Sequence, residues 1–428
     1  MELLLITTHF PYNENDAVFI KPEIPFLSNA FDRIHILYTD KNATQFKKIE
    51  VPKNVYIISH KESNLSLKGN KFTRFFNTFF CSFFSPFYIV SICIFEYLYL
   101  FRQNKLNKNT AKIAIKYILM ANLDACFLKK YLSQNSDIKI IYTFWYERNT
   151  FSALICKKYF IKNIKCVTRT HGIDLYEHQN ENNYLPYKTW MDKSIDRIFF
   201  VSKAGYDYYN NLFANQQTRE KYIVLKLGIE NQYNFILKDD YIRKKLNVIS
   251  CSYIIPRKRI NLIIEALSNI IDISINWVHI GDGPEKNYIE KLAEQLLDNK
   301  TNIKYNFIGH LNNDSIKDFY HNNHFDCFIS TTAAEGGNPV SMMEAISFGI
   351  PIIATNTGGV PEVVQKENGI LINSDNPVTE LADALQHFAA MTNQEMMSIR
   401  KNCREYWENN YRAETQYPLF VAELKKLL

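Results

Sequence analysis

Short apolar runs alternate with longer amphipathic segments along the whole chain. The runs are rich in β-branched and aromatic residues, which favours strands, whereas the longer segments have the apolar spacing of helices. Because the runs are apolar on both faces, we expect parallel sheets covered by helices on each side. Predicted strands of the first half span Leu3–Thr7, Ile34–Thr39, Val55–Ser59, Ile138–Phe144, Cys166–Thr170, Ile198–Ser202 and Ile223–Leu227. Those of the second half span Val248–Ser252, Asn276–Ile280, Tyr305–Ile308, Cys327–Thr331, Pro351–Thr355 and Gly369–Ile372.

Two such series predict an α/β protein with two Rossmann-like, doubly wound domains. The boundary is expected where the chain turns at Gly228 and crosses the polar stretch ENQYNFILKDDYIRKKLN. We therefore predict an N-terminal domain over residues 1–228, a linker over 229–247 and a C-terminal domain over 248–401. An amphipathic segment over 402–428 is predicted to be a helix that packs back toward the N-terminal domain.

One segment of the N-terminal half departs from this pattern. Residues 75–101 contain a single charge, Glu96, among 27 mostly apolar residues, a length that could span a membrane. Pro86 and several serines interrupt the segment and argue against a span. Buried helices and a patch that lies on a membrane surface both remain possible.

Composition excludes several classes of protein. The chain has 428 residues, 46% of them hydrophobic and 14% aromatic, which excludes global disorder. A net charge of +6 is too small to indicate nucleic-acid binding. The eight cysteines form no CxxC pair, which is typical of free thiols in a reducing compartment. The apolar N-terminus lacks the basic region of a signal peptide, so we expect a buried first strand and a cytoplasmic protein.

Glycine usage points to the C-terminal half as the place of chemistry. Of only 13 glycines, nine lie between Gly281 and Gly369. A chain that uses glycine so sparingly needs it there for tight turns or for close approach of backbone to a ligand.

The richest stretch is TTAAEGGNPVSMMEAISFGIPIIATNTGGVPEVV, residues 331–364. A predicted strand runs into a polar turn and then into a helix that ends at Gly349. Asn338 is expected to cap this helix, with Pro339 as its first residue. Backbone amides of the two glycines before a helix N-terminus favour binding of an anion or a sugar phosphate. A tight turn with solvated glutamates is the alternative.

This arrangement resembles the signature of retaining glycosyltransferases of family 4, which have the GT-B fold of two Rossmann-like domains facing across a cleft. Glu335 and Glu344 occupy the places of the family's two glutamates. Further segments that resemble the family are residues 9–27, 169–177 (RTHGIDLYE), 250–267 (SCSYIIPRKRINLIIEAL), 278–286 (VHIGDGPEK) and 307–311 (FIGHL).

The resemblance implies that the N-terminal domain binds the acceptor and that the C-terminal domain binds the nucleotide sugar, and it implies a role for each matching residue. Glu344 would hold the ribose hydroxyls and Lys258 the diphosphate. Glu335 would orient the donor sugar, and His171 would contact it from the N-terminal domain. Further donor-binding candidates are Gly336, Gly337, Asn338, Pro339, Arg257, Arg259 and His310.

Two features depart from the family pattern. Eight residues separate Glu335 from Glu344, where the family has seven, so one extra residue lies in the turn. Tyr253 also stands where the family has an arginine, and Arg257 or Arg259 could supply the missing charge.

The implied activity is retaining transfer of a sugar from a UDP-, GDP- or dTDP-sugar to a saccharide acceptor, expected to be lipid-linked. The context would be bacterial surface polysaccharide assembly, of O-antigen, capsule or exopolysaccharide, at the inner face of the cell membrane with peripheral contact. No aspartates are separated by one residue, so we expect neither a metal nor another cofactor. A nucleotide-sugar epimerase, a phosphorylase and a catalytically silent GT-B scaffold are the alternatives.

Overall fold

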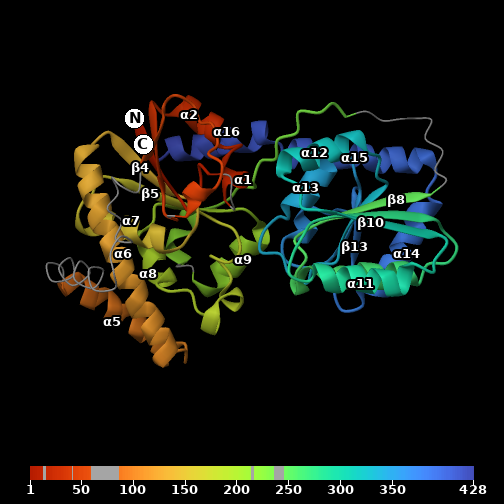
Figure 1. The fold of residues 1–428 in the computed structure, drawn as a ribbon. Helices are drawn as coiled ribbons and strands as arrows, with labels where there is room; N and C mark the ends of the chain where they lie inside the picture. Colours follow the sequence, from red (N-terminus) through yellow and green to blue (C-terminus); the bar gives the residue numbers. More distant parts are fainter. Residues whose placement is uncertain (13–15, 41, 59–85, 214–215, 236–244) are drawn as a thin grey trace. The chain divides into compact units, whose positions relative to one another are not determined.

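The computed structural model describes residues 1–12, 16–40, 42–58, 86–213, 216–235 and 245–428. These residues form two compact units, each an α/β domain around its own sheet (Figure 1). The first unit contains Met1–Leu225 together with Tyr417–Leu428, and the second contains Lys226–Gln416.

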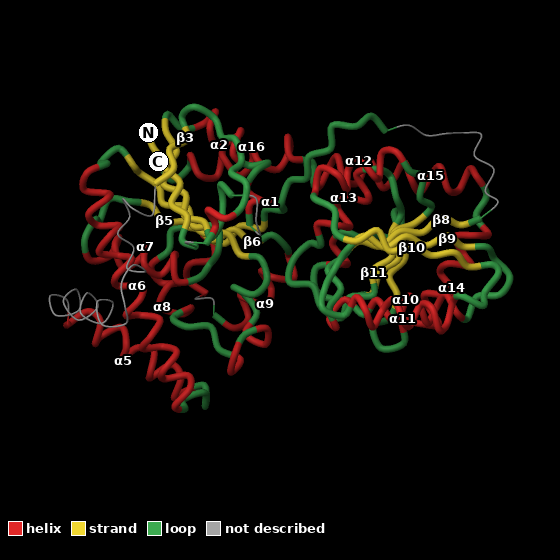
Figure 2. The backbone as a smooth tube through the Cα atoms, in the orientation of Figure 1, coloured by secondary structure: helices red, strands yellow, loops and turns green. Residues whose placement is uncertain are grey.

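A parallel sheet of seven strands forms the centre of the N-terminal unit, in the order β3-β2-β1-β4-β5-β6-β7. In Figure 2 the strands of each unit are drawn in yellow with red helices around them. Both faces of its central strands are buried, as at Leu3, Leu4 and Leu5 of β1. The strands are β1 (Glu2–Thr7), β2 (Arg33–Tyr38), β3 (Val55–Ile58), β4 (Ile138–Thr143), β5 (Lys165–Thr170), β6 (Arg197–Phe200) and β7 (Tyr222–Val224). The helices are α1 (Ala17–Ile20), α2 (Ile24–Ala30), α5 (Pro86–Arg102), α6 (Lys108–Gln134), α7 (Arg148–Tyr159), α8 (Lys188–Ser194) and α9 (Lys203–Leu212).

A second parallel sheet, of six strands in the order β10-β9-β8-β11-β12-β13, forms the centre of the C-terminal unit. The strands are β8 (Leu246–Cys251), β9 (Ile275–Ile280), β10 (Ile303–Gly309), β11 (Cys327–Ser330), β12 (Ile352–Thr355) and β13 (Gly369–Ile372). The helices are α10 (Ile260–Ser268), α11 (Lys286–Leu297), α12 (Asn313–Asn322), α13 (Val340–Ser347), α14 (Pro377–Ala390) and α15 (Asn393–Asn410).

The predicted pair of Rossmann-like parallel-sheet domains is confirmed, and every predicted strand is present with ends shifted by a few residues. The domain bounds differ from those predicted, because the units divide after Leu225 and residues 402–428 are not one helix. Arg412 forms a β-bridge with Ile229, and this extended residue separates α15 from α16 (Ala413–Lys425). The function predicted for each domain stays a prediction.

The end of the chain completes the N-terminal unit. Phe420 and Leu424 of α16 are fully buried in the same core as Tyr142 and Phe199. The guanidinium of Arg169 lies 4.2 Å from the centre of the Phe420 ring. Arg169 is itself fully buried and donates to a carboxylate oxygen of Glu23 at 2.5 Å, which compensates its charge.

Helix α5 displays an apolar stripe on its surface. Residues 75–85 of the predicted apolar segment lie outside the described part, and Pro86 is the first described residue of α5. Five apolar side chains of α5 lie at helical spacing and have 51% to 89% of their surface exposed. We call them the α5 stripe: Phe87, Val90, Ile94, Leu98 and Phe101. Glu96, by contrast, is buried and accepts hydrogen bonds from Tyr184 and the Tyr187 amide. Within the described residues, no helix combines the length and apolarity needed to cross a bilayer.

Candidate functional site

The C-terminal sheet reverses its strand order between β8 and β11. Ligands of open α/β sheets bind at such a reversal, beyond the carboxyl ends of the strands. The loop after β8 carries Lys258, and the loop after β11 carries Glu335. Both predicted site residues therefore leave the sheet at the same place.

Lys258 and Glu335 form an ion pair in which the lysine ammonium donates to the carboxylate. Both side chains are largely covered, with 18% and 12% of their surface exposed. The loops themselves are joined by a hydrogen bond from the Ala333 amide to the Arg257 carbonyl oxygen, at 2.8 Å. The Lys258 ammonium therefore lies beside the Glu335 carboxylate at the point where the strand order reverses.

Gly358 and Gly359, in the loop after β12, allow that loop to approach the turn after β11 closely. Gly358 has a φ of +52°, and a Cβ there would lie 1.9 Å from the Glu335 carbonyl oxygen. A Cβ at Gly359 would lie 2.4 Å from the Gly337 carbonyl oxygen. Only glycine fits so close a backbone contact, so this pair fixes the position of the Glu335 turn.

Arg259 joins two loops of the C-terminal unit through side-chain hydrogen bonds. Its backbone is left-handed, with φ of 49°, and its guanidinium Nε donates to the Thr331 carbonyl oxygen at 2.7 Å. The terminal nitrogens donate to the Thr332 and Ser374 carbonyl oxygens and to the Ser374 hydroxyl. Because four of its five N–H groups are engaged, the structure gives Arg259 a part in joining loops. Its predicted donor contact stays untested.

The start of α13 differs from the prediction. Helical geometry begins at Val340, and Pro339, with ψ of 119°, is the capping residue. The Met342 and Met343 amides donate to the Pro339 carbonyl oxygen, both at 3.1 Å. Asn338 is buried one position earlier, so the prediction that it caps the helix is wrong. The extended backbone at Pro339 moves the helix start by one residue.

Glu344 lies on α13 with only 4% of its surface exposed. Burial raises its pKa to about 7, although the positive charge of Lys317 acts in the opposite direction. One carboxylate oxygen accepts a hydrogen bond from the Asn313 side-chain amide at 3.0 Å. The group thus lies near the middle of its titration at neutral pH, and two hydroxyls could satisfy its ionised form.

The other predicted donor-binding residues are not drawn into these contacts. Arg257 and His310 are exposed, and Tyr253 has 60% of its surface exposed at the reversal point. Gly336 and Gly337 form the turn between β11 and α13. The structure therefore pairs Lys258 with Glu335, whereas the side chains of Arg257 and His310 take no part in that ion pair.

His171 follows β5 in the N-terminal unit. Its Nε2 lies 3.1 Å from the Phe144 carbonyl oxygen, which can only accept, so Nε2 carries the proton and Nδ1 is an acceptor. Burial lowers the pKa of the imidazole to about 4. His171 is therefore neutral near pH 7, so its ring can form hydrogen bonds but does not carry a positive charge.

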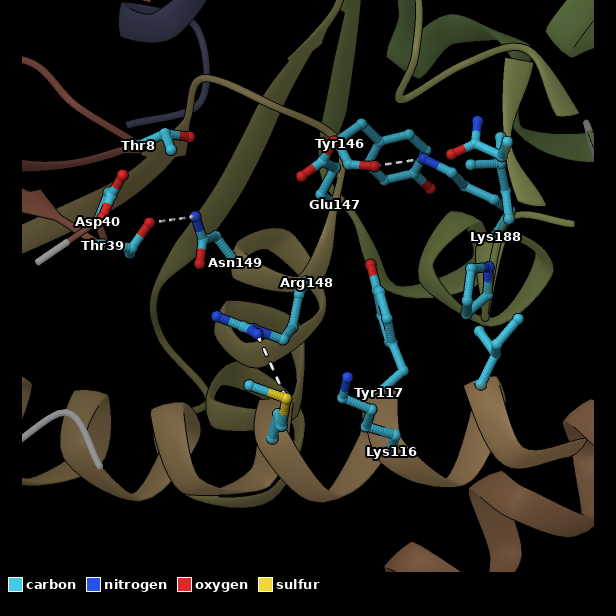
Figure 3. Close-up of a pocket in the computed structure, with 15 residues that line it drawn as sticks. Thr8, Thr39, Asp40, Lys116, Tyr117, Tyr146, Glu147, Arg148, Asn149 and Lys188 are labelled. Atoms are coloured by element: carbon cyan, nitrogen blue, oxygen red, sulfur yellow. Dashed lines mark hydrogen bonds between the residues drawn. The ribbon is translucent and has the colours of Figure 1, made fainter. Parts of the chain in front are cut away.

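A cavity of about 720 Å³ opens at the carboxyl edge of the N-terminal sheet (Figure 3). Its lining includes three residues that sequence analysis did not single out, Glu147, Arg148 and Lys188. A signal was present for two of them, because WYERN directly follows the predicted strand Ile138–Phe144. No clustered His, Cys, Asp or Glu side chains suited to a metal occur among the residues that the structure places.

Comparisons with known proteins agree with this geometry. Residues 242–409 match the family described as glycosyl transferases group 1. The colanic acid biosynthesis glycosyltransferase WcaL of Escherichia coli K12 is 24% identical over 253 residues, 58% of this chain and 61% of WcaL. The match thus spans about three fifths of that relative's length.

Two solved structures share the fold over the whole chain. The lipopolysaccharide outer core galactosyltransferase WaaB has a TM-score of 0.67 at 12% identity, covering 100% of this chain and 99% of WaaB. HepE of Anabaena, solved with UDP-glucose, has a TM-score of 0.64 at 16% identity and covers 100% of both chains. The predicted resemblance to GT-B glycosyltransferases is confirmed; assignment to family 4 stays a prediction.

Proposed function

We propose that this chain, whose residues 242–409 match the group 1 glycosyl transferases, transfers a sugar from a nucleotide-sugar donor to a saccharide acceptor in bacterial surface polysaccharide biosynthesis. The observation that carries the proposal is the Lys258–Glu335 pair at the strand reversal of a GT-B fold. The glycosyltransferase activities named for WcaL and WaaB, together with UDP-glucose in the HepE structure, support the same class of activity.

In this proposal Lys258 binds the donor diphosphate and stabilises the charge that develops on the leaving group. Glu335 exchanges its ion pair for hydrogen bonds to the donor sugar. Glu344 accepts hydrogen bonds from the ribose hydroxyls, which would compensate the cost of ionising it in a buried position. His171 offers Nδ1 as a neutral acceptor to the sugar. Retention of configuration and family 4 chemistry belong to the proposal as well.

The test is a transfer assay with UDP-, GDP- and dTDP-sugars, with and without lipid-linked saccharides extracted from a bacterial membrane. We expect one donor to be consumed only when acceptor is present. Consumption without acceptor would favour an epimerase or a hydrolase, and dependence on phosphate would favour a phosphorylase. Donor binding without turnover would favour a silent scaffold, an alternative suggested by Tyr253 at the reversal point.

Transfer activity is expected to survive EDTA. The reason is that Lys258 and the backbone amides of the turn supply positive charge to the diphosphate, while the sequence lacks paired aspartates spaced for a metal. The measurement compares initial rates before and after exhaustive chelation. Complete loss that Mg²⁺ or Mn²⁺ restores would contradict the metal-independent mechanism.

We also propose that the protein binds peripherally to the inner face of the cell membrane through the α5 stripe. Scattered apolar residues are normal on a surface, but the five residues of this stripe lie along one face of a helix. Exposed basic residues follow at its C-terminal end, namely Arg102 and Lys108, whereas Lys105 is paired with Glu177. Together these are the parts of an interfacial helix, in which apolar side chains enter the bilayer and cations contact anionic headgroups.

Flotation with anionic liposomes measures this binding. Wild-type protein is expected to float at low salt and to float less at high salt, because screening weakens the basic contribution. Replacing Ile94 and Leu98 with serine should reduce flotation at least about tenfold, since each side chain contributes roughly 1 kcal/mol or more of apolar transfer. Replacing Ile271, an exposed isoleucine of the C-terminal unit, is the matched control. Equal flotation of both variants would exclude the stripe as the contact.

A further inference from the structure

One face of helix α12 lies toward Glu344, the buried acid of α13. Asn313 begins α12 and Lys317 follows one turn later, so their side chains share a face of the helix. Ile316 and Tyr320 extend the same face and are buried. Asn313 and Lys317 are half-buried, so each lies at the border between the protein interior and solvent.

The two oxygens of the Glu344 carboxylate have different surroundings. Oε1 accepts the hydrogen bond from the Asn313 side-chain amide at 3.0 Å. Oε2 accepts no hydrogen bond from any described residue, and it is not one of the buried oxygens that lack a partner. Oε2 is therefore open to solvent, so one oxygen is held by the protein and the other remains for a ligand.

Lys317 brings the positive charge that acts on this carboxylate. Burial raises the pKa of Glu344, and the Lys317 ammonium lowers it. The other titratable groups that face Glu344 are Tyr320 of α12 and Cys251 at the end of β8. Burial raises the pKa of both groups, so both are neutral at pH 7 and neither compensates a negative charge.

The cations of neighbouring elements have partners of their own. Arg404 of α15, which packs against α13, donates to the Ser347 carbonyl oxygen at 2.7 Å. Lys258, in the loop after β8, is paired with Glu335. Strand β12 also packs against α13 and has no charged side chain. Within the described residues, compensation of the Glu344 charge therefore comes from α12.

The protonation state of Glu344 decides what its carboxyl group can bind. An ionised carboxylate accepts hydrogen bonds at both oxygens, whereas a protonated one has an O–H that must itself find an acceptor. An amide donor and a nearby cation both favour the ionised form, against the cost of burial. Loss of either contact would therefore leave a larger fraction of the protein with a protonated acid at pH 7.

We propose that Asn313 and Lys317 are positioning residues for the nucleotide: Asn313 orients the Glu344 carboxylate through Oε1, and Lys317 keeps that carboxylate ionised for the ribose hydroxyls. The inference rests on the proposed binding of a nucleotide sugar and adds the two residues through which α12 acts on the ribose acceptor. Both residues act through Glu344 and not by contact with the nucleotide. Helix α12 thereby sets the pH range over which the donor binds.

Calorimetric titration of the full chain with UDP-glucose, GDP-mannose and dTDP-glucose at several pH values tests the inference. The diphosphate of these donors keeps its charge near neutral pH, so the pH dependence of affinity reports on the protein. In the wild type, affinity is expected to rise with pH around the Glu344 pKa of about 7 and then to level off. Lys317→Gln should move this rise to higher pH, with affinity about three- to tenfold lower at pH 7 and nearly equal at about pH 8.5.

Further variants separate the charge of Lys317 from the amide of Asn313. Asn313→Ala should also move the rise to higher pH, and Asn313→Asp should move it further, because a second carboxylate then faces Glu344. Lys317→Arg keeps the charge and is expected to match the wild type. Asn322→Ala is the matched control, since Asn322 is exposed at the other end of α12. In Glu344→Gln protein, Lys317→Gln should have no further effect on affinity.

Urea unfolding without ligand measures the same control of Glu344 independently of the donor. The stability lost through Lys317→Gln should be larger at about pH 8.5 than at about pH 5.5, because only the ionised carboxylate needs the cation. This difference should vanish in Glu344→Gln protein. The unfolding curves also show whether each variant is folded.

The outcomes distinguish this inference from the proposed function. If donor affinity rises at an unchanged pH in Lys317→Gln or Asn313→Ala, the role assigned to that residue is overturned. A loss of affinity that is equal at every pH would overturn it too, since it would show direct contact with the nucleotide. If no nucleotide sugar binds but the stability difference is present, the proposed transfer is rejected and the control of Glu344 by α12 is supported.

Discussion

Lys258→Ala is expected to lower kcat/KM for sugar transfer by about 30-fold to 1,000-fold, or roughly 2–4 kcal/mol, the scale for losing one preorganised charge partner. The substitution removes the cation that the loop after β8 places at the strand reversal. It also leaves Glu335 covered and without its ion pair. Initial rates over a range of donor concentrations would measure the effect, and unfolding curves would show whether the fold is retained.

Lys291→Ala is the matched control for this substitution. Lys291 is an exposed lysine on α11, at a distance along the chain from both loops of the site. Its replacement is expected to change kcat/KM less than about twofold. If Lys258→Ala were mild while Arg257→Ala abolished transfer, the phosphate-binding role would belong to Arg257.

Glu344→Gln is expected to weaken nucleotide binding at least about tenfold, since the charged acceptor for the ribose hydroxyls is lost. In the same variant the ligand-free protein should become more stable above neutral pH. The folded-state pKa of Glu344, about 7, lies above the usual value of 4.5, so ionisation opposes folding. A substitution that raises the stability of the protein and weakens nucleotide binding would be a strong indication that Glu344 is a functional residue.

The sign of the pH effect follows from proton binding. Between pH 4.5 and about 7 the unfolded chain releases this proton before the folded chain does, so the contribution of Glu344 to stability falls as pH rises. Glu344→Gln should therefore match wild type near pH 4.5 and exceed it by about 3 kcal/mol above pH 8. Calorimetric titration and urea unfolding at both pH values measure the two effects. Equal donor affinity in the variant would remove Glu344 from the ribose role.

Glu335→Gln provides the comparison within the site. Its side chain lies in the turn rather than inside α13, so we expect slower turnover with nearly unchanged nucleotide affinity. The measurement is kcat beside the donor dissociation constant. A large loss of nucleotide affinity with kcat preserved would reverse the roles assigned to Glu335 and Glu344.

Local sequence predicted the sheets well, because both faces of these strands are buried and the pattern is therefore a continuous apolar run. Lys258 and Glu335 lie at one edge of the C-terminal sheet, since each follows a predicted strand and parallel strands end together. The direction in which each side chain points does not follow from local sequence. Arg259 is adjacent to Lys258, yet its left-handed backbone turns the guanidinium toward carbonyl oxygens of two other loops.

The N-terminal cavity could not be predicted for a different reason. Its lining comes from loops after three strands, from α6 and from a segment near Lys188, all far apart in sequence. No spacing rule connects them, because a long helix carries its residues to the sheet edge only after it packs. Thr8, Asp40 and Glu147 each come after a predicted strand, but a single polar residue in that position is an insufficient signal.

The return of residues 417–428 to the N-terminal unit bears on how the protein is made. A ribosome synthesises Met1–Leu225 first, but Phe420 and Leu424 of that unit's core emerge only after Lys226–Gln416. Until then the fully buried surface around Arg169 has no covering helix, whereas Lys226–Gln416 already has its complete set of strands. The N-terminal unit is thus completed only after the C-terminal unit has been synthesised. Until then a nascent chain would expose an apolar groove, which is the kind of surface that chaperones bind.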